Sequence, residues 1–242
     1  MERTVYDRMN ELEQSHWWFV GRRRIIAALI VRFLPKGGKA NILEAGCGSG
    51  GNLAMLGSLG TVDAFEYDAD ARQHATEKSG LDVRFGALPD DLPFADRRYD
   101  LIGLFDVLEH VEADTASLAA LAARLSDKGV ILVTVPAFPF LWSRHDERHH
   151  HFRRYTRKTL AEVAAKAGLK VRYSSYFNFF LFPVAVATRA LKRLTGSETP
   201  DDSMPSGWVN GVLTRVFGAE RHLVGRLRLP FGLSLAAVLE RA

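Results

Sequence analysis

A cluster of glycines follows a short apolar segment, where residues 41–53 read N-I-L-E-A-G-C-G-S-G-G-N-L. Ile42 and Leu43 are typical of a buried parallel strand, and glycine occupies four of the six positions 46–51. Glycine adopts positive φ and lets the backbone approach a ligand, so a strand that ends in such a turn can hold a nucleotide at the following helix. The segment fits both G-x-G-x-x-G and G-x-G-x-G, so the glycines alone leave the kind of nucleotide open.

Two acids stand at informative distances from this turn. Glu44 lies two residues before Gly46, and Glu66 lies twenty residues after it, at the end of the apolar run 61–66. An acid at the end of a second strand can accept hydrogen bonds from both hydroxyls of an adenosine ribose. The acids therefore support an adenosine-containing cofactor, without separating a dinucleotide from S-adenosylmethionine.

Histidines are concentrated in the second half of the chain. Four of the eight fall within the seven positions 145–151, and His110 ends the segment D-V-L-E-H. Histidine titrates near neutral pH and suits proton abstraction, while histidines together with Asp146 could instead ligate a divalent ion. A solvated polar lid with one or two structural histidines, and packing of His110 at a helix start, are the alternatives without chemistry.

The stretch 86–110 completes a recognisable set, because it contains Leu92-Pro93-Phe94 shortly before the apolar run 101–105. With the glycine turn and the two acids, it resembles the class I S-adenosylmethionine-dependent methyltransferases from about Ile42 to Leu169. The resemblance implies S-adenosylmethionine as cofactor and S-adenosylhomocysteine as product. It also implies an α/β, Rossmann-like, doubly wound sheet of seven strands with an antiparallel last strand.

The resemblance assigns most of the cofactor contacts to the ends of strands one, two and four. The expected cofactor-binding residues are Glu44, Gly46, Cys47, Gly48, Gly50, Asn52, Glu66, Tyr67, Leu88, Phe105, Asp106 and Val107. Many relatives carry an aspartate after the glycine that ends strand three, where this chain has Ala87. The backbone at Leu88, or one of Asp90 and Asp91, is expected to replace that contact.

The segment 106–110 also resembles the E-x-x-E-H segment of ubiquinone-biosynthesis O-methyltransferases and small-RNA ribose methyltransferases. In those families the two acids and the histidine can hold a divalent metal. Asp106 replaces the first glutamate with a shorter side chain, so we assign no metal and keep Glu109 and His110 as candidate ligands. The predicted catalytic residues are His110, His149, His150 and Asp106; the predicted substrate-binding residues are Trp17, Trp18, His145, Arg154 and Tyr155.

Alternating apolar segments and turn signals predict the elements that position these residues. The expected strands are 42–45, 62–66, 83–85, 101–105, 130–135, 169–173 and 232–239. The expected helices are 2–14, 25–34, 52–59, 70–78, 111–125 and 158–167, with Gly129 near the end of the fifth as a C-cap. The resulting organisation is a helical cap (1–40), a cofactor-binding core (41–175 and 230–242) and a helical insertion (176–229).

The insertion is unusually rich in aromatic residues. Residues 176–183 read Y-F-N-F-F-L-F-P. Residues 208–227, which begin with Trp208, have apolar residues at helical spacing and predict an amphipathic helix. Such a composition predicts contact with a lipid surface or a lipophilic acceptor. Burial of the two helices against each other and the sheet, or in a homodimer, is the alternative.

Composition, charge and cysteine content argue against several classes of protein. The 242 residues have 47% hydrophobic and 25% charged residues, with a net charge of +4, which is ordinary for a globular domain and too little to favour nucleic acid. Cys47 is the only cysteine, so an intramolecular disulfide is excluded and a reducing compartment fits. We find no signal-peptide pattern and no apolar run of membrane-spanning length, so we expect a cytoplasmic protein that could associate with a membrane.

The function predicted from the sequence is methyl transfer to the oxygen of a hydroxyl on a lipid-linked, glycan or quinol-type acceptor. The start H-W-W-F and the end L-P-F-G-L-S-L look like those of bacterial methyltransferases of glycan or lipid assembly. An RNA ribose or small-molecule N-methyltransferase is the main alternative. An NAD-dependent oxidoreductase and a degenerate cofactor-binding scaffold without activity remain as further classes.

Overall fold

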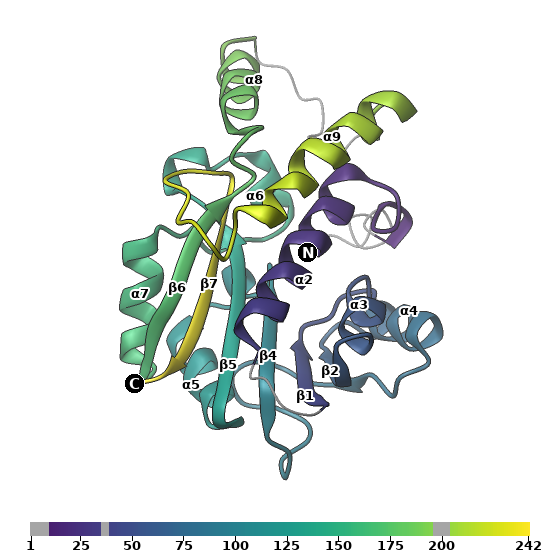
Figure 1. Ribbon diagram of the computed structural model, residues 1–242, viewed down its shortest axis with the longest axis vertical. Coiled ribbons are helices and arrows are strands. Elements are labelled where there is room, and N and C mark those ends of the chain that lie inside the picture. Colours follow the sequence, from purple (N-terminus) through teal and green to yellow (C-terminus); the bar gives the residue numbers. More distant parts are fainter. Residues whose placement is uncertain (1–9, 35–38, 196–203) are drawn as a thin grey trace.

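The computed structural model describes residues 10–34, 39–195 and 204–242. Its centre is a seven-stranded sheet with the strand order β3-β2-β1-β4-β5-β7-β6 (Figure 1). β7 is antiparallel to both β5 and β6, and the remaining neighbours pair in parallel. The predicted Rossmann-like sheet with an antiparallel last strand is confirmed.

All seven predicted strands are present. They are β1 (Ala40–Ala45), β2 (Gly60–Glu66), β3 (Arg84–Phe85), β4 (Tyr99–Phe105), β5 (Leu125–Pro136), β6 (Leu169–Phe177) and β7 (Ser234–Arg241). Parallel strands end at the same edge of a sheet, and ligands bind beyond that edge in open α/β folds. The glycine turn after β1, Glu66 at the end of β2 and Asp106 after β4 therefore meet at one edge.

Helices cover both faces of the sheet. They are α2 (Trp17–Phe33), α3 (Leu53–Gly57), α4 (Ala69–Ser79), α5 (Asp114–Ala122), α6 (Arg144–Arg148), α7 (Arg157–Lys166), α8 (Phe182–Thr195) and α9 (Gly207–Ala219), with the short 3₁₀ helices η1 (Leu108–His110), η2 (Pro139–Leu141) and η3 (Glu220–His222). Successive residues of a strand point to opposite faces, so Leu101 joins the apolar core beneath α2 and α9, whereas Ile102 joins the core beneath α5 and α7.

Several predicted boundaries differ from the structure. α2 begins at Trp17 rather than at Ile25, because the His16 side chain accepts a hydrogen bond from the Trp18 amide and caps the helix eight residues earlier. The fifth predicted helix ends at Ala122 instead of 125. Gly129 was expected as its C-cap, but it lies inside β5, where an added Cβ would meet the Tyr99 carbonyl at 2.5 Å. Cross-strand crowding, and not a left-handed turn, explains this glycine.

The predicted cap and insertion are joined to the core and to each other. α2 buries Ile25, Ile26 and Leu29 on the sheet, and α9 crosses over α2 (Figure 1). α8 projects from the edge of the sheet at which β6 ends (Figure 1). None of the described helices combines the length and the apolar character that a membrane crossing requires. Most of the helix expected over 2–14 lies outside the described residues.

Candidate active site

The glycine turn has the backbone conformation that its sequence predicts. Gly46, Gly48 and Gly50 have φ of 72°, 54° and 86°, in the left-handed region that side chains disfavour. The amides of Gly46 and Cys47 both donate to the Phe65 carbonyl, at 3.0 and 3.1 Å. The turn is therefore tied to β2 and held open toward the edge of the sheet.

Glu66 is fixed in place by backbone donors. The Gly48 amide donates to its Oε2 at 2.8 Å, and the Asp68 amide donates to its Oε1 at 2.9 Å. Burial raises the pKa of Glu66, and these amide bonds oppose the shift. Each carboxylate oxygen can accept a further hydrogen bond, so Glu66 can still receive two ribose hydroxyls.

Glu44 is buried with an unused oxygen. The Asn52 side chain donates to its Oε1 at 2.8 Å, while its Oε2 has no hydrogen-bond partner. Only 1% of Glu44 is exposed, and burial raises its pKa to about 8. An unpaired buried carboxyl is costly, so a cationic ligand group at this position would stabilise it.

Asp106 stands at the end of β4 in a left-handed conformation, with φ of 59°. Its Oδ2 forms an ion pair with the Arg22 guanidinium and lies 3.3 Å from the Thr134 hydroxyl. Arg22 comes from α2 and also stacks over the Trp18 ring, with 4.7 Å to the ring centroid. The Arg22 Nε atom is buried without a partner, so it can donate to an anionic ligand group.

The segment before α2 lies directly against the glycine turn. Glu13 is buried and accepts a hydrogen bond from the Ser49 hydroxyl at 2.8 Å. Arg23 donates to the carbonyls of Glu13 and Gly51, at 2.6 and 3.1 Å. An added Cβ at Gly51 would lie 2.5 Å from the Glu13 carboxylate. Gly51 is thus explained by the close approach of this segment, which covers the predicted cofactor turn.

A large cavity joins these groups to the histidines. It has a volume of about 1120 Å³ and runs from the glycine turn past Asp106 to the loop after β5 and to residues of α8 and α9. A single drug-sized ligand needs roughly 300–1,000 Å³. The cavity can therefore accommodate an adenosine cofactor together with part of a second molecule.

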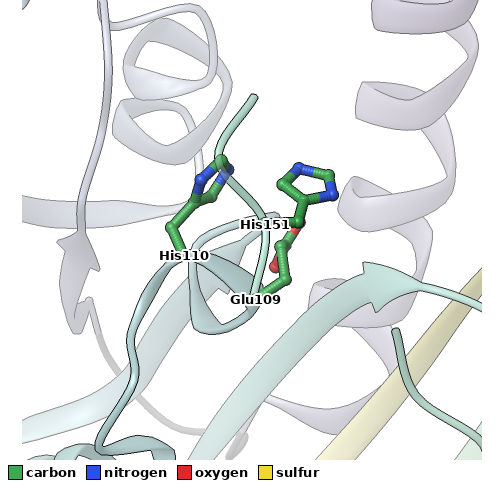
Figure 2. A group of neighbouring side chains, drawn as sticks. All are labelled: Glu109, His110 and His151. Carbon is green, nitrogen blue, oxygen red and sulfur yellow. The ribbon is translucent and has the colours of Figure 1, made fainter. Parts of the chain in front are cut away.

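Three side chains in the cavity wall meet at its histidine-lined part (Figure 2). Glu109, His110 and His151 each present one potential ligand atom, and these atoms lie within 4.8 Å of one another. Glu109 is 1% exposed with an unpartnered Oε2, and burial raises its pKa to about 8. Burial and the neighbouring His151 lower the pKa of His110 to about 3, so its imidazole is neutral at neutral pH.

The loop that carries His151 is organised around the buried carboxylate of Asp146. His151 Nδ1 lies 2.9 Å from Asp146 Oδ1, and Arg154 donates to both oxygens of Asp146 at 2.7 and 2.9 Å. These bonds hold the pKa of Asp146 well below its usual range, although burial alone would raise it. With its Nδ1 held by a carboxylate, His151 keeps Nε2 for another contact.

Most residues predicted from the sequence line the cavity. Those found there are Glu44, Gly46, Cys47, Gly48, Asn52, Glu66, Tyr67, Leu88, Phe105, Asp106, Val107, His110, Trp17, Trp18, His145, His149, His150 and Arg154. Ala87 and Leu88 line it as well, whereas Asp90 and Asp91 do not. The Ala87 backbone pairs with that of Asp91 at 2.7 and 2.8 Å.

Two predicted site residues lie elsewhere. Gly50 does not line the cavity, and an added Cβ there would meet Ala75 at 2.9 Å, so helix packing explains it. Tyr155 is 1% exposed, and its hydroxyl donates to Asp114 at 2.9 Å behind the wall. Arg154 reaches the cavity, but its guanidinium is committed to Asp146 and to the Ala137 carbonyl.

The sequence interpretation did not single out Arg22, Asn178 or the pairing of Asp146 with His151. Arg22 was one of three consecutive arginines, and only the helical phase of α2 turns it, rather than Arg24, into the site. Asn178 is a polar residue within an aromatic run. The residue lines the cavity, and its side-chain amide is fully buried without a partner.

Comparison with known proteins agrees with this geometry. Residues 19–174 match the family model described as a methyltransferase domain. A probable S-adenosylmethionine-dependent methyltransferase of Mycobacterium tuberculosis is 28% identical over 136 residues, which are 56% of this chain and 47% of that protein. Another protein so described, from Mycolicibacterium smegmatis, is 27% identical over 164 residues, covering 66% of this chain and 62% of its own length. The chain thus spans about half the length of the first of these relatives.

Solved structures show the same fold at low identity. A chain of the complex between the Haloferax volcanii Trm112 methyltransferase activator and a methyltransferase aligns with a TM-score of 0.64 and 19% identity, covering 98% of this chain and 94% of that chain. A methyltransferase structure from Bacillus halodurans aligns with a TM-score of 0.58 and 14% identity, covering 89% and 97%. Since the family model matches more than half of the chain, we conclude that the chain belongs to the class I S-adenosylmethionine-dependent methyltransferase family.

Proposed function

We propose that the protein transfers the methyl group of S-adenosylmethionine to a hydroxyl of a lipophilic acceptor of the lipid-linked, glycan or quinol type. The observation that carries this proposal is that the glycine turn, the histidines and apolar residues of α8 and α9 line one continuous cavity of about 1120 Å³. Its buried polar atoms without partners include Arg22 Nε, Glu44 Oε2 and Glu109 Oε2. Such atoms are rare in native interiors and point to a polar ligand.

The cofactor end of the cavity suits the charges of S-adenosylmethionine. Glu66 would accept hydrogen bonds from the ribose hydroxyls, and Glu44 would accept one from the methionine ammonium. Arg22 would donate a hydrogen bond to the methionine carboxylate. This placement pairs the ammonium and the carboxylate of the ligand with buried groups of opposite charge, Glu44 and Arg22. The sulfonium methyl would then face away from the glycine turn, toward the wall that carries Glu109 and His110.

Methyl transfer is an in-line displacement, so alignment within near-attack distance is the main task of the enzyme. Bound S-adenosylmethionine would supply the methyl group to the acceptor oxygen and would leave as S-adenosylhomocysteine. The hydroxyl proton would pass to an imidazole of the wall. His151 is the best oriented of these, since the Asp146 carboxylate holds its Nδ1 and leaves Nε2 as the proton acceptor.

The same wall could bind a divalent ion of the kind that the E-x-x-E-H families hold. Two imidazoles and one buried carboxyl with an unpartnered oxygen form a suitable donor set, and the Asp146 carboxylate would orient the His151 ring through Nδ1. Glu109, His110 and His151 would hold the ion, whereas Asp106 is already paired with Arg22. With an ion bound, His151 Nε2 would be a metal ligand in place of the proton acceptor. A bound divalent ion would lower the pKa of the acceptor hydroxyl.

The apolar part of the wall supports a lipophilic acceptor. Leu181 and Val184 of the α8 segment, Leu213 of α9 and Leu233 line the cavity. Val184 is 62% exposed and Trp208, which does not line the cavity, is 76% exposed. Exposed apolar side chains on these two helices are suited to a lipid surface, from which such an acceptor could enter.

Incubation with radiolabelled S-adenosylmethionine and separate lipid, glycan, RNA and small-metabolite extracts tests the proposal. Label in the lipid or glycan fraction, in a base-stable methyl ether, is the expected result. Label confined to RNA or to a nitrogen atom would contradict it. Calorimetry with S-adenosylhomocysteine and NAD in parallel separates the cofactor assignment from the acceptor assignment.

A further inference from the structure

Asn178 has an environment that the proposed methyl transfer does not explain. It follows β6 directly and is completely buried, and it lines the cavity. Neither its Nδ2 nor its Oδ1 has a hydrogen-bond partner. Burying a side-chain amide without hydrogen bonds is strongly unfavourable, so an amide in this position is expected to have a partner that enters from the cavity.

The backbone around Asn178 is built to hold this side chain in place. Asn178 has φ of 59°, a conformation that asparagine tolerates better than most residues. The next two amides, of Phe179 and Phe180, both donate to Glu220 Oε1, at 2.8 and 3.0 Å. Glu220 is itself fully buried at the end of α9. A buried carboxylate from a distant segment thus fixes the turn that presents the amide.

The surroundings of the amide in the cavity are mainly apolar. Leu181, just before α8, Ala185 of α8, Leu213 of α9 and Leu233 before β7 line the same cavity. Ser234, a small polar lining residue, pairs across the sheet with Phe177, the residue before Asn178. Ligand sites generally combine such an apolar lining with a few polar groups that fix orientation. The amide is therefore in the position of an orienting group.

The strand order gives its distance from the cofactor end. β5 and β7 lie between β4, which ends at Asp106, and β6, which ends beside Asn178. Three inter-strand steps of about 4.8 Å place the ends of β4 and β6 about 14 Å apart. A molecule that contacts both the residues beyond β4 and Asn178 must be elongated.

We propose that the Asn178 side chain binds a polar group of the acceptor that can both donate and accept hydrogen bonds, a hydroxyl or an amide, at a distance of about 14 Å from the end of β4. The inference rests on the proposed function for the identity of this ligand as an acceptor. It adds that the acceptor is elongated and amphipathic, with a second polar group set within its apolar part. Asn178 is then a specificity-determining residue.

Two variants separate a ligand contact from a structural one. Asn178→Gly removes the amide and keeps the left-handed backbone, which glycine adopts without strain. Asn210→Ala is the matched control, since the Asn210 amide is fully paired, accepting from the Trp17 amide and donating to the Ser15 carbonyl, both at 2.8 Å. In the protein without ligands, Asn178→Gly should leave the melting temperature within about 2 °C of wild type, while Asn210→Ala should lower it by roughly 4–8 °C.

Binding is measured on the protein saturated with S-adenosylhomocysteine, with octanamide and N,N-dimethyloctanamide as probes in ligand-observed NMR. The second probe has the same chain but lacks N–H donors. Wild type should bind octanamide at least fivefold more tightly, and Asn178→Gly should bind the two probes equally.

Two results would overturn the proposal. The first is a loss of melting temperature in Asn178→Gly as large as that in Asn210→Ala, because the amide would then be structural. The second is an absence of preference in wild type, or a preference that survives in Asn178→Gly. Neither measurement needs turnover, so a protein that discriminates the probes yet methylates no extract would refute the proposed function and retain the polar contact.

Discussion

The substitution Glu44→Gln should have opposite effects on stability and on cofactor binding. Glutamine has nearly the same shape, and its oxygen can still accept the Asn52 hydrogen bond of 2.8 Å. It cannot ionise. The variant therefore isolates the contribution of the buried charge at this position from that of packing.

The magnitude follows from the pKa of Glu44, which burial raises from 4.5 to about 8. The folded-state pKa exceeds the unfolded one, so stability from this group is fully present below about pH 4.5 and is lost as the pH rises to about 8. At about 1.4 kcal/mol for each pKa unit, the loss approaches 5 kcal/mol. Glu44→Gln should avoid this loss, so its advantage over wild type should grow by several kcal/mol between pH 5 and pH 9.

Urea denaturation of the protein without cofactor, at pH 5, 7 and 9, measures this difference. Glu162→Gln serves as the matched control, because Glu162 is exposed on α7, and it should follow wild type at every pH. Calorimetry with S-adenosylhomocysteine should show at least tenfold weaker binding to Glu44→Gln at pH 8, since the variant lacks the charge for the ligand ammonium. Parallel stability curves for wild type and Glu44→Gln would refute the burial argument, and equal affinity would refute the ammonium assignment.

Four further outcomes are expected. Glu66→Ala should weaken S-adenosylhomocysteine binding at least tenfold in calorimetry, because charged hydrogen bonds contribute about 1.5–3 kcal/mol; unchanged affinity would reject the ribose assignment. His151→Ala should lower turnover about 100-fold or more with cofactor affinity nearly intact, and substitutions of His110 and His149 should be compared with it; full activity in all three would remove histidine from the mechanism. If Glu109, His110 and His151 hold a catalytic metal, exhaustive chelation should abolish turnover, and the divalent ion that restores turnover would be that metal. Full activity after chelation would reject the metal and leave proton transfer to a histidine. The monomeric protein should float with anionic vesicles more than with neutral ones, and Trp208→Ser should reduce flotation; association with neither vesicle, or burial of α8 and α9 in a dimer, would reject the membrane surface.

The sequence determined the cofactor half of the fold and of the site. The glycine turn, the position of Glu66 twenty residues after Gly46 and the alternation of strands and helices are patterns within short segments of the chain. Such patterns depend on local backbone conformation, so they can be recognised without knowledge of the tertiary contacts. The residues at the ends of β1, β2 and β4 were therefore predictable, because parallel strands bring their carboxyl ends to one edge. The extent of α2 was not, since its first turn is capped by His16 and is held by contacts with α9.

Tertiary structure alone decided the acceptor half. Arg22 enters the site because α2 packs across the sheet in one rotational setting, and Asn178 lies in the cavity wall in a turn that Glu220, more than forty positions away, fixes. The sequence prediction chose His149 and His150 from the four histidines of the loop, whereas the bond to Asp146 distinguishes His151. Tyr155 shows the converse, as its hydroxyl is directed inward to Asp114. In each case the deciding contact joins segments far apart in the chain, and a sequence pattern specifies neither the partner nor the direction in which a side chain points.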